Sequence, residues 1–110
     1  QVVEWIAADG ADFVDASSGG NVADARIPVG PSYQVWIAQR LRGHGLPVGA
    51  VGLITTAEQA EGILASGQAD VISIGRAALV NPALPLEWAH TLRDEHAADL
   101  VPAQYWRARF

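Results

Sequence analysis

Small and charged residues gather in three short segments whose composition suits the binding of an anion. The segments are Ser17-Ser18-Gly19-Gly20, Gly52 and Gly75-Arg76. A glycine lets backbone N–H groups approach a phosphate, and an arginine guanidinium can donate two parallel hydrogen bonds to its oxygens. Turn geometry alone would explain either single glycine, and a surface salt bridge would explain Arg76 alone. Their joint occurrence favours a phosphate site.

Each of these segments follows, or ends, an apolar run that is typical of a β-strand. The runs are ADFVDAS at 11–17, PVGAVGLI at 47–54 and DVISI at 70–74. The middle run is apolar almost throughout, which predicts a strand covered on both faces. Helical patterns alternate with the strands, at 1–9, 32–42, 56–66 and 85–95. This order predicts parallel strands with right-handed crossovers, so the three segments should meet at one edge of the sheet.

Spacing within the helical segments predicts which residues face inward. The inward residues are expected to be Val2, Val3, Ile6 and Ala7; Tyr33, Trp36, Ile37 and Leu41; Ala60, Ile63 and Leu64; and Leu86, Ala89, His90 and Leu92. Thr56 with Gln59, or Thr55 with Glu58, fits a capping box. Gly10 and Gly67 are expected to end the first and third helices.

Composition excludes several classes of function. The 110 residues carry 7 basic and 12 acidic side chains, a net charge of −5, which argues against nucleic acid as the main partner. With 0 Cys, the chain has no disulfide, thiolate metal site or cysteine nucleophile. No apolar run approaches the ~20 residues that span a bilayer, so we expect no membrane partner. The absence of Cys does not decide the redox compartment, and a reducing cytoplasm is the simplest expectation. Because the chain begins at Gln1, holds no Met and opens as a helix, we expect a piece of a longer protein.

The remaining ionisable residues do not form a second site. His44, His90 and His96 lack metal-ligand spacing, so we expect no metal. Asp15 and Asp70 flank strands, where hydrogen bonding in turns or caps is the expected role. By alternation alone, a doubly wound sheet and a piece of a (β/α)₈ barrel fit equally well.

A longer stretch of the sequence resembles a known family. VGLITTAEQAEGILASGQADVISIGRAALVNP, at 51–82, resembles the last two βα units of the flavin-dependent (β/α)₈ oxidoreductases, and most closely the old yellow enzyme family. DFVDASSGG and PSYQVWIAQRLR are similar to that family's sixth strand and its following helix. The ending PAQYWRARF resembles the C-terminus of its bacterial, thermophilic-like branch. The resemblance implies an α/β fold in which 1–96 form the C-terminal three βα units, about strands 6 to 8, of a TIM barrel.

The resemblance also implies a chemistry. FMN would be the cofactor, NADPH or NADH the hydride donor, and α,β-unsaturated carbonyl compounds the substrates. Gly52, Gly75 and Arg76 would hold the FMN phosphate. Ser17 or Ser18 would lie near the ribityl chain, although both could equally solvate the loop.

The tail at 97–110 is expected to be irregular and to pack at a subunit interface. Its aromatic residues Tyr105, Trp106 and Phe110 would forgo burial worth roughly 1.5–3 kcal/mol each if they stayed exposed. By resemblance, Arg107, with Tyr105 nearby, would line the substrate pocket of a partner subunit in a homodimer or homotetramer. The alternative is a tail that packs on the helices of its own chain.

No catalytic residue is expected in this chain. In the resembled family, the substrate-binding His pair and the proton-donating Tyr belong to earlier strands, so the isolated segment would be inactive and would depend on the missing N-terminal part of the barrel. Two other enzyme classes also fit, namely a tRNA-dihydrouridine synthase-like flavoenzyme and a non-flavin phosphate-binding TIM barrel. A non-catalytic piece that packs against a partner is a further alternative.

Overall fold

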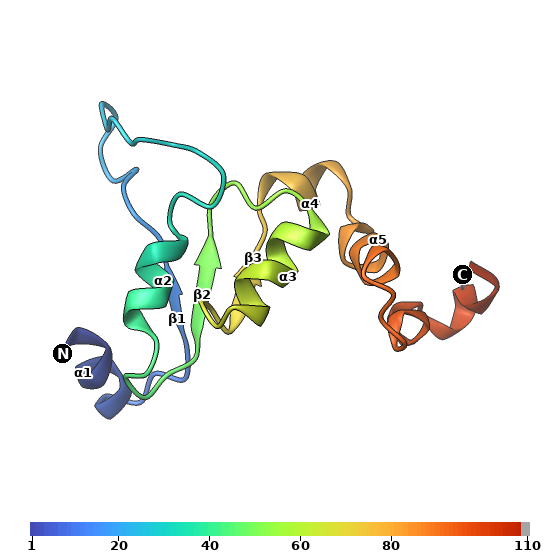
Figure 1. Cartoon of the computed structure of the whole chain (residues 1–110), viewed down its shortest axis with the longest axis horizontal. Coiled ribbons are helices and arrows are strands. Elements are labelled where there is room, and N and C mark those ends of the chain that lie inside the picture. The colour runs from blue at the N-terminus through green and yellow to red at the C-terminus, as the bar shows by residue number, and fades with distance from the viewer. Residues whose placement is uncertain (109–110) are drawn as a thin grey trace.

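A three-stranded parallel sheet forms the centre of the chain. The structure, a computed structural model, describes residues 1–108. Strands β1 (Val14–Ala16), β2 (Val48–Val51) and β3 (Val71–Ser73) lie side by side in the order β1-β2-β3. All pairs are parallel, and Asp15, Gly49 and Val71 form one row across the sheet. The predicted parallel arrangement is confirmed, and the carboxyl ends of the strands share one edge (Figure 1).

Helices occupy the connections between the strands, as the alternating pattern predicts. The elements are α1 (Val2–Ala8), α2 (Val35–Leu41), α3 (Ala57–Ala65), α4 (Arg76–Val80) and α5 (Leu84–Thr91), followed by the 3₁₀ turns η1 (Ala97–Leu100) and η2 (Ala103–Ala108). Helix α2 packs on β1 and β2, whereas α3 packs on β3 and α5. The predicted alternation therefore describes the fold, with α4 added.

One face of the sheet is covered by these helices and the other is open. Side chains alternate between the faces of a strand, and Ala16, Val48 and Ala50 face the helices and are buried. On the opposite face, Phe13 and Val71 remain 42% and 43% exposed. Strand β2 itself is buried at Val48, Gly49 and Ala50, as predicted for a strand covered on both faces. A Cβ on Gly49 would meet the side chains of Phe13 and Asp15, so these two side chains cover β2 on the open face.

The chain is more open than a compact domain of its length. Its radius of gyration is 16.2 Å and its extents are 48 × 34 × 25 Å. A compact domain of ~100 residues has a radius of gyration of about 13 Å. Figure 1 shows the reason, because the elements spread from α1 at one end to η2 at the other. The described residues therefore form an extended arrangement, with the buried core confined to the sheet and its helices.

Helix α2 differs from its prediction in both start and phase. Ser32 has φ 57°, a left-handed conformation that a helix cannot contain, so α2 begins at Val35 and not at Ser32. Its buried residues are Val35 and Ala38. Trp36, predicted to face inward, is 59% exposed.

The first and last α-helices also differ from their predictions. In α1 only Val3 is buried, and Val2 is 64% exposed. Helix α5 ends at Thr91, two residues before Arg93 with its φ of 57°. Leu92, beyond the helix, and His90, within it, are both exposed, although both are predicted to face inward. The short α4 was not predicted, since only five residues separate Gly75 from the Asn-Pro pair that follows.

The cap prediction for α3 is confirmed in a modified form. The Gln59 backbone N–H donates to Thr56 Oγ1 at 3.2 Å, which selects this pair over Thr55 and Glu58. The reciprocal bond goes to the preceding residue, because Thr55 N–H donates to Gln59 Oε1 at 2.9 Å. Gly10 and Gly67, with φ 97° and 71°, end α1 and α3 as predicted. Leu64 of the predicted inward stripe is 37% exposed.

The tail is more regular than predicted. Residues 97–108 form the two 3₁₀ turns and not an irregular coil, and Ala97 and Val101 are buried against the rest of the chain. Tyr105 and Trp106 remain 63% and 58% exposed. Phe110, the third aromatic residue of the prediction, lies outside the described residues.

Candidate functional site

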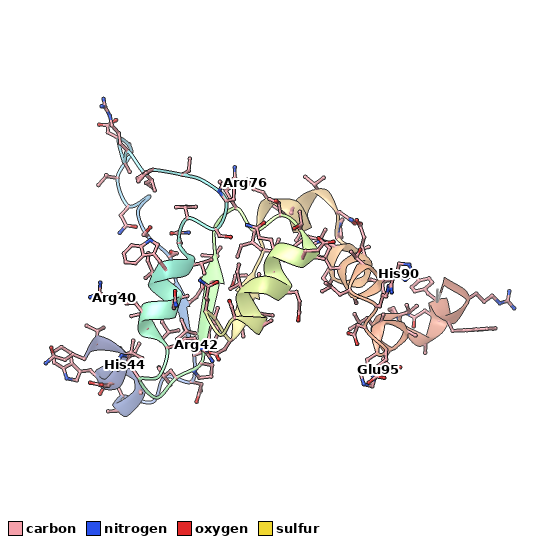
Figure 2. The ribbon with its side chains drawn as sticks, viewed as in Figure 1. Arg40, Arg42, His44, Arg76, His90 and Glu95 are labelled. Atoms are coloured by element: carbon pink, nitrogen blue, oxygen red, sulfur yellow. The ribbon has the colours of Figure 1, made fainter. Side chains whose placement is uncertain are left out.

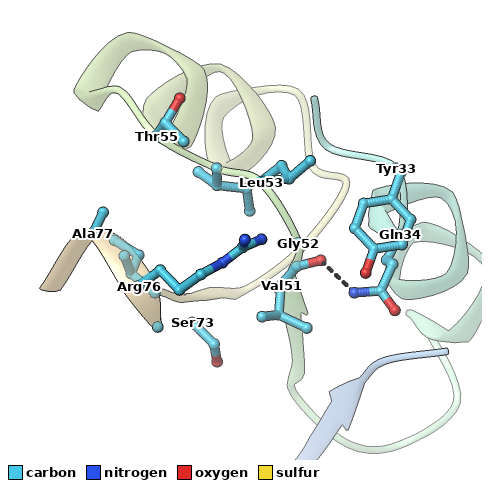
Figure 3. Close-up of a pocket in the computed structure, with 12 residues that line it drawn as sticks. Tyr33, Gln34, Val51, Gly52, Leu53, Thr55, Ser73, Arg76 and Ala77 are labelled. Atoms are coloured by element: carbon cyan, nitrogen blue, oxygen red, sulfur yellow. Dashed lines mark hydrogen bonds between the residues drawn. The ribbon is translucent and has the colours of Figure 1, made fainter. Parts of the chain in front are cut away.

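A cavity of about 250 Å³ lies at the carboxyl ends of β2 and β3 (Figure 3). The segment after β2 and the segment from β3 into α4 form two of its walls, and the start of α2 forms the third. The lining residues are Tyr33, Gln34, Val51, Gly52, Leu53, Ile54, Thr55, Ser73, Ile74, Gly75, Arg76 and Ala77. Three of the residues predicted to bind phosphate, Gly52, Gly75 and Arg76, are thus brought together in one cavity.

Gly52 needs to be a glycine for two reasons. Its φ of +117° lies in the region that side chains disfavour. A Cβ at this position would also lie 2.7 Å from both Gln34 Nε2 and Tyr33 Cε1. The backbone of the loop after β2 therefore runs directly against the side chains that begin α2, as a backbone cradle requires.

Gly75 and Arg76 complete the opposite wall. Gly75 occupies the N-cap position of α4, and no atom within 4 Å would meet a Cβ there, so the space in front of it is open. The Arg76 guanidinium extends across the cavity toward Gly52 and Leu53 (Figure 3). Within residues 1–108 no acidic side chain pairs with Arg76, which removes the salt-bridge alternative for this part of the chain.

Helix dipoles add less to the cavity than the sequence suggests. Helix α4 has five residues, too few for a substantial macrodipole, and no side chain caps its N-terminus. The N-terminus of α3 is already capped by Thr56. The positive charge of the cavity therefore comes from Arg76.

The loop after β2 is held in place by Gln59 of α3. Its Nε2 donates to Leu53 O at 3.0 Å and to Ser32 Oγ at 2.6 Å. Leu53 and Ser32 both have left-handed backbones, with φ 50° and 57°. Such residues persist only where the surroundings hold them, and Gln59 supplies that restraint. The capping pattern identified Gln59 as a cap residue, but not as the restraint on this loop.

Ser17 and Ser18 lie beside the cavity and do not line it. Ser18 N–H and Ser18 Oγ both donate to Gln34 Oε1, the second at 3.0 Å. Gln34 does line the cavity, and its Nε2 donates to Val51 O at 3.2 Å. The sequence analysis did not identify Gln34. The signal that could have revealed it is a polar side chain directly before the apolar start of α2.

Tyr105 and Arg107 are not brought to this cavity within one chain. Segment η2, which carries both, lies beyond α5 and apart from the strand ends (Figure 1). The Arg107 guanidinium lies 5.5 Å from the centre of the Trp106 ring, within the tail itself. Their predicted role in a partner subunit stays a prediction.

The histidines lie away from the cavity, as Figure 2 shows for His44 and His90. His44 is at the opposite end of the strands, where its Nδ1 lies 3.1 Å from Glu4 Oε1. His96 faces Glu95 and Asp99 in the exposed tail. In the described part of the chain, no three His, Cys, Asp or Glu side chains gather where a metal ion could be held.

The two aspartates that flank strands do more than cap turns. Asp15 accepts a hydrogen bond from Ser73 Oγ at 3.2 Å across the open face of the sheet. Asp70 binds Arg42 through two hydrogen bonds, of 3.2 and 2.7 Å, and accepts the Val48 N–H at 2.9 Å. The hydrogen bonds from Arg42 and Val48 hold the pKa of Asp70 below its usual 3.8. The prediction of turn or cap bonds is therefore wrong for both residues.

The cavity suits the binding of a small anionic group. At about 250 Å³ it is smaller than the roughly 300–1,000 Å³ of pockets that enclose a whole drug-sized ligand. It can therefore take one end of a cofactor, such as a phosphate, and not all of FMN. Apart from Arg76 and the Tyr33 phenol, its lining carries no ionisable side chain, so it is built to bind and not to exchange protons.

None of the helices in residues 1–108 is long and apolar enough to cross a membrane. This finding concerns the described helices only.

Sequence comparison places the chain among flavin-dependent enzymes. Residues 1–95 match the family described as "NADH:flavin oxidoreductase / NADH oxidase family". Similar proteins named NADPH dehydrogenase occur in Listeria innocua, with 47% identity over 96% of this chain, and in Bacillus pumilus, with 44% identity over 97%. A third, from Listeria monocytogenes, is 45% identical over 96%. The chain spans 30–31% of the length of these relatives. The match confirms the old yellow enzyme resemblance, and the chain belongs to the NADH:flavin oxidoreductase / NADH oxidase family.

Proposed function

We propose that this chain supplies the FMN-phosphate site of an FMN-dependent NAD(P)H oxidoreductase built as a (β/α)₈ barrel. The flavin in the family description and the NADPH in the names of the relatives support FMN as cofactor and NADPH or NADH as donor. The same match favours this function over a non-flavin barrel and over a dihydrouridine synthase. The parallel sheet with its site at the carboxyl ends of the strands is the arrangement that barrel enzymes use.

The observation that carries the proposal is the pairing of an unneutralised guanidinium with a glycine cradle. Arg76 reaches across the cavity to the Gly52 backbone without a carboxylate partner among the described residues (Figure 3). A phosphate is the group that such a pair binds best, because it accepts charge-assisted hydrogen bonds from both sides.

The residues of the cavity would hold and orient the cofactor. When bound, FMN would supply the relay of a hydride from NAD(P)H to the activated C=C bond of an α,β-unsaturated carbonyl compound. Arg76 and the backbones at Gly52 and Gly75 would fix the phosphate, and the Ser17–Ser18 loop would lie along the ribityl chain. Because this cavity would hold the phosphate end of the cofactor, the proton donor and the groups that bind the carbonyl would come from outside it.

The open face of the sheet supports a larger barrel around this chain. Phe13 and Val71 remain 42% and 43% exposed on a face that also bears the Asp15–Ser73 hydrogen bond. Strands β1 and β3 are both edge strands of the described sheet. Further barrel strands would cover this face and pair with both edges.

The exposed tail supports a homo-oligomer. Tyr105 and Trp106 stay 63% and 58% exposed although they belong to an ordered turn. A second subunit, in a dimer or tetramer, would bury them and would receive Arg107 at its substrate pocket.

The test places the chain in a complete barrel. In a chimera, these 110 residues replace the segment of the Listeria innocua NADPH dehydrogenase that they match. Arg76→Ala removes a charge-assisted pair worth ~2–3 kcal/mol, so FMN affinity should fall by about 30- to 150-fold. Fluorescence titration of the flavin-free chimera with FMN measures this. Arg40→Ala, which removes an exposed arginine on α2, is the matched control and should bind FMN as the parent does (Figure 2).

The chimera also tests the reaction. We expect it to oxidise NADPH in the presence of cyclohexenone and to hold a flavin absorbance band. Equal FMN affinity in the Arg76→Ala and Arg40→Ala variants would refute the phosphate site. A chimera that binds FMN but leaves every enone unreduced would refute the proposed substrate class alone.

A further inference from the structure

Gln34 is a buried polar residue at the junction of two strand ends. Among the described residues whose burial is assigned, it is the one buried polar side chain, with 4% exposed. It stands at the N-cap position of α2 without capping that helix by its side chain. Buried polar groups are hydrogen-bonded, and this amide does not cap its own helix, so its partners must lie in other segments of the chain.

The Gln34 amide joins the loop after β1 to the end of β2. Its Oε1 accepts both the backbone N–H and the hydroxyl of Ser18, the latter at 3.0 Å. Its Nε2 donates to Val51 O at 3.2 Å (Figure 3). Two donors at Oε1 and an acceptor at Nε2 allow one orientation of the amide only. Ser18 and Val51 are therefore held at a fixed separation.

The same amide also defines the shape of the cavity. Nε2 lies 2.7 Å from the place that a Cβ on Gly52 would occupy, so Gln34 packs directly against the glycine cradle. Arg76 reaches the other side of that cradle (Figure 3). Ser18, Gln34 and Gly52 thus form one continuous contact from the serine loop to the phosphate cavity.

The loop that Gln34 anchors is long and exposed. Residues 17–33 contain no helix or strand, and most of them are exposed. Within the loop, Ile27 packs closely on Gly19, where a Cβ would lie 2.4 Å from Ile27 Cδ1. Arg26 is exposed in the same stretch. The hydrogen bonds to Ser18 are therefore the tie that sets where this loop leaves the sheet.

We propose that Gln34 is a positioning residue that holds the Ser17–Ser18 loop against the Gly52 cradle, so that one bound cofactor can meet both. This inference rests on the proposed function for its cofactor, but the anchoring of the loop is independent of any ligand. Gln34 does not act on the substrate. Its effect is to fix the distance between the part of the site expected to bind the ribityl chain and the part expected to bind the phosphate.

The experiment compares three variants in the chimera with the Listeria innocua enzyme. Gln34→Met keeps the length of the side chain but removes all three hydrogen bonds. Gln34→Glu keeps the acceptor for Ser18 and removes the donor to Val51 O. Gln39→Met makes the same chemical change at an exposed glutamine of α2 and serves as the control.

The first readout needs no flavin. Trypsin cleavage after Arg26 reports the loop, and cleavage after Arg40, inside α2, reports general opening of the fold. In the flavin-free chimera, Gln34→Met should speed cleavage at Arg26 and leave Arg40 protected. Gln34→Glu keeps the acceptor for Ser18 but sets a carboxylate oxygen against Val51 O, so cleavage at Arg26 should be faster than in the parent. Gln39→Met should be cleaved as slowly as the parent. Equal acceleration at both arginines would mean that Gln34 only supports the fold, and this would overturn the proposal.

The second readout is FMN affinity. Gln34→Met should bind FMN about tenfold more weakly, the effect of losing roughly one hydrogen bond of pre-organisation. Parent-like affinity in Gln34→Met, with Arg76→Ala still impaired, would overturn the positioning role and leave the proposed function standing. A parent chimera that does not bind FMN would instead count against the proposed function, and the cleavage at Arg26 would still decide whether Gln34 anchors the loop.

Discussion

Replacement of Gly52 by alanine tests the geometry of the cavity most directly. An alanine at φ +117° is strained, at a cost of about 1–2 kcal/mol. Its Cβ would lie 2.7 Å from Gln34 Nε2, so the amide must move away from Val51 O. The carbonyl of the half-buried Val51 would then be left without this donor, which costs about 1–3 kcal/mol more. The variant should therefore lose about 2–5 kcal/mol of unfolding free energy.

Gly20 provides a matched control for the strain alone. Its φ is +80°, but no atom lies within 4 Å of a Cβ built there. Gly20→Ala should therefore cost only the ~1–2 kcal/mol of the strained backbone. Urea unfolding of the flavin-free chimera, followed by circular dichroism, measures both variants under the same conditions.

The difference in unfolding free energy between the two variants tests whether Gln34 and Tyr33 crowd Gly52. Gly52→Ala should be less stable than Gly20→Ala by about 1–3 kcal/mol, the part due to Gln34 and its carbonyl. Equal losses would show that Gln34 and Tyr33 do not crowd Gly52. This result would refute the close packing of Gly52 against the side chains that begin α2.

Two further predictions concern the opposite end of the strands and the tail. The pKa of Asp70 in the folded chain lies below its usual 3.8, so its bonds to Arg42 and Val48 contribute stability above that pH and lose it as the pH falls through the lowered value. Asp70→Asn should therefore lower the unfolding midpoint of the chimera at neutral pH and flatten its pH dependence below 3.8, whereas an unchanged acid profile would contradict the assignment. If Arg107 acts in a partner subunit, Arg107→Ala should impair cyclohexenone reduction, and mixed dimers of Arg107→Ala with Arg76→Ala subunits should regain activity. Mixed dimers no more active than the two separate variants would show that the tail acts within its own chain.

The site was predictable where local chemistry decides it. The regular βα alternation, with a glycine or arginine after each strand, was enough to predict that Gly52, Gly75 and Arg76 lie at one edge of the sheet. The edge follows from topology, because parallel strands share their carboxyl ends. This placement does not depend on which other side chains line the cavity around Gly52.

The supporting residues could not be predicted in the same way. Gln34 and Gln59 act through partners up to 17 and 27 residues away, at Val51 and Ser32, and no local pattern reveals such bonds. The left-handed backbone of Ser32 delays the start of α2. Trp36 faces outward because Val35 and Ala38 form the buried face of α2, although the spacing of Trp36 is typical of a buried position.

Two arginines, one at each end of this sheet, differ in their hydrogen-bond partners and therefore in what they can do. At the amino ends of the strands, Arg42 donates to both carboxylate oxygens of Asp70 and to Gly67 O, so its hydrogen-bonding capacity serves the fold. At the carboxyl ends, Arg76 has neither a carboxylate nor a carbonyl partner in the described chain. A guanidinium without a partner beside a restrained glycine loop stabilises nothing by itself. Its charge is available to an anion that enters the cavity, which is why we propose the binding function for this end.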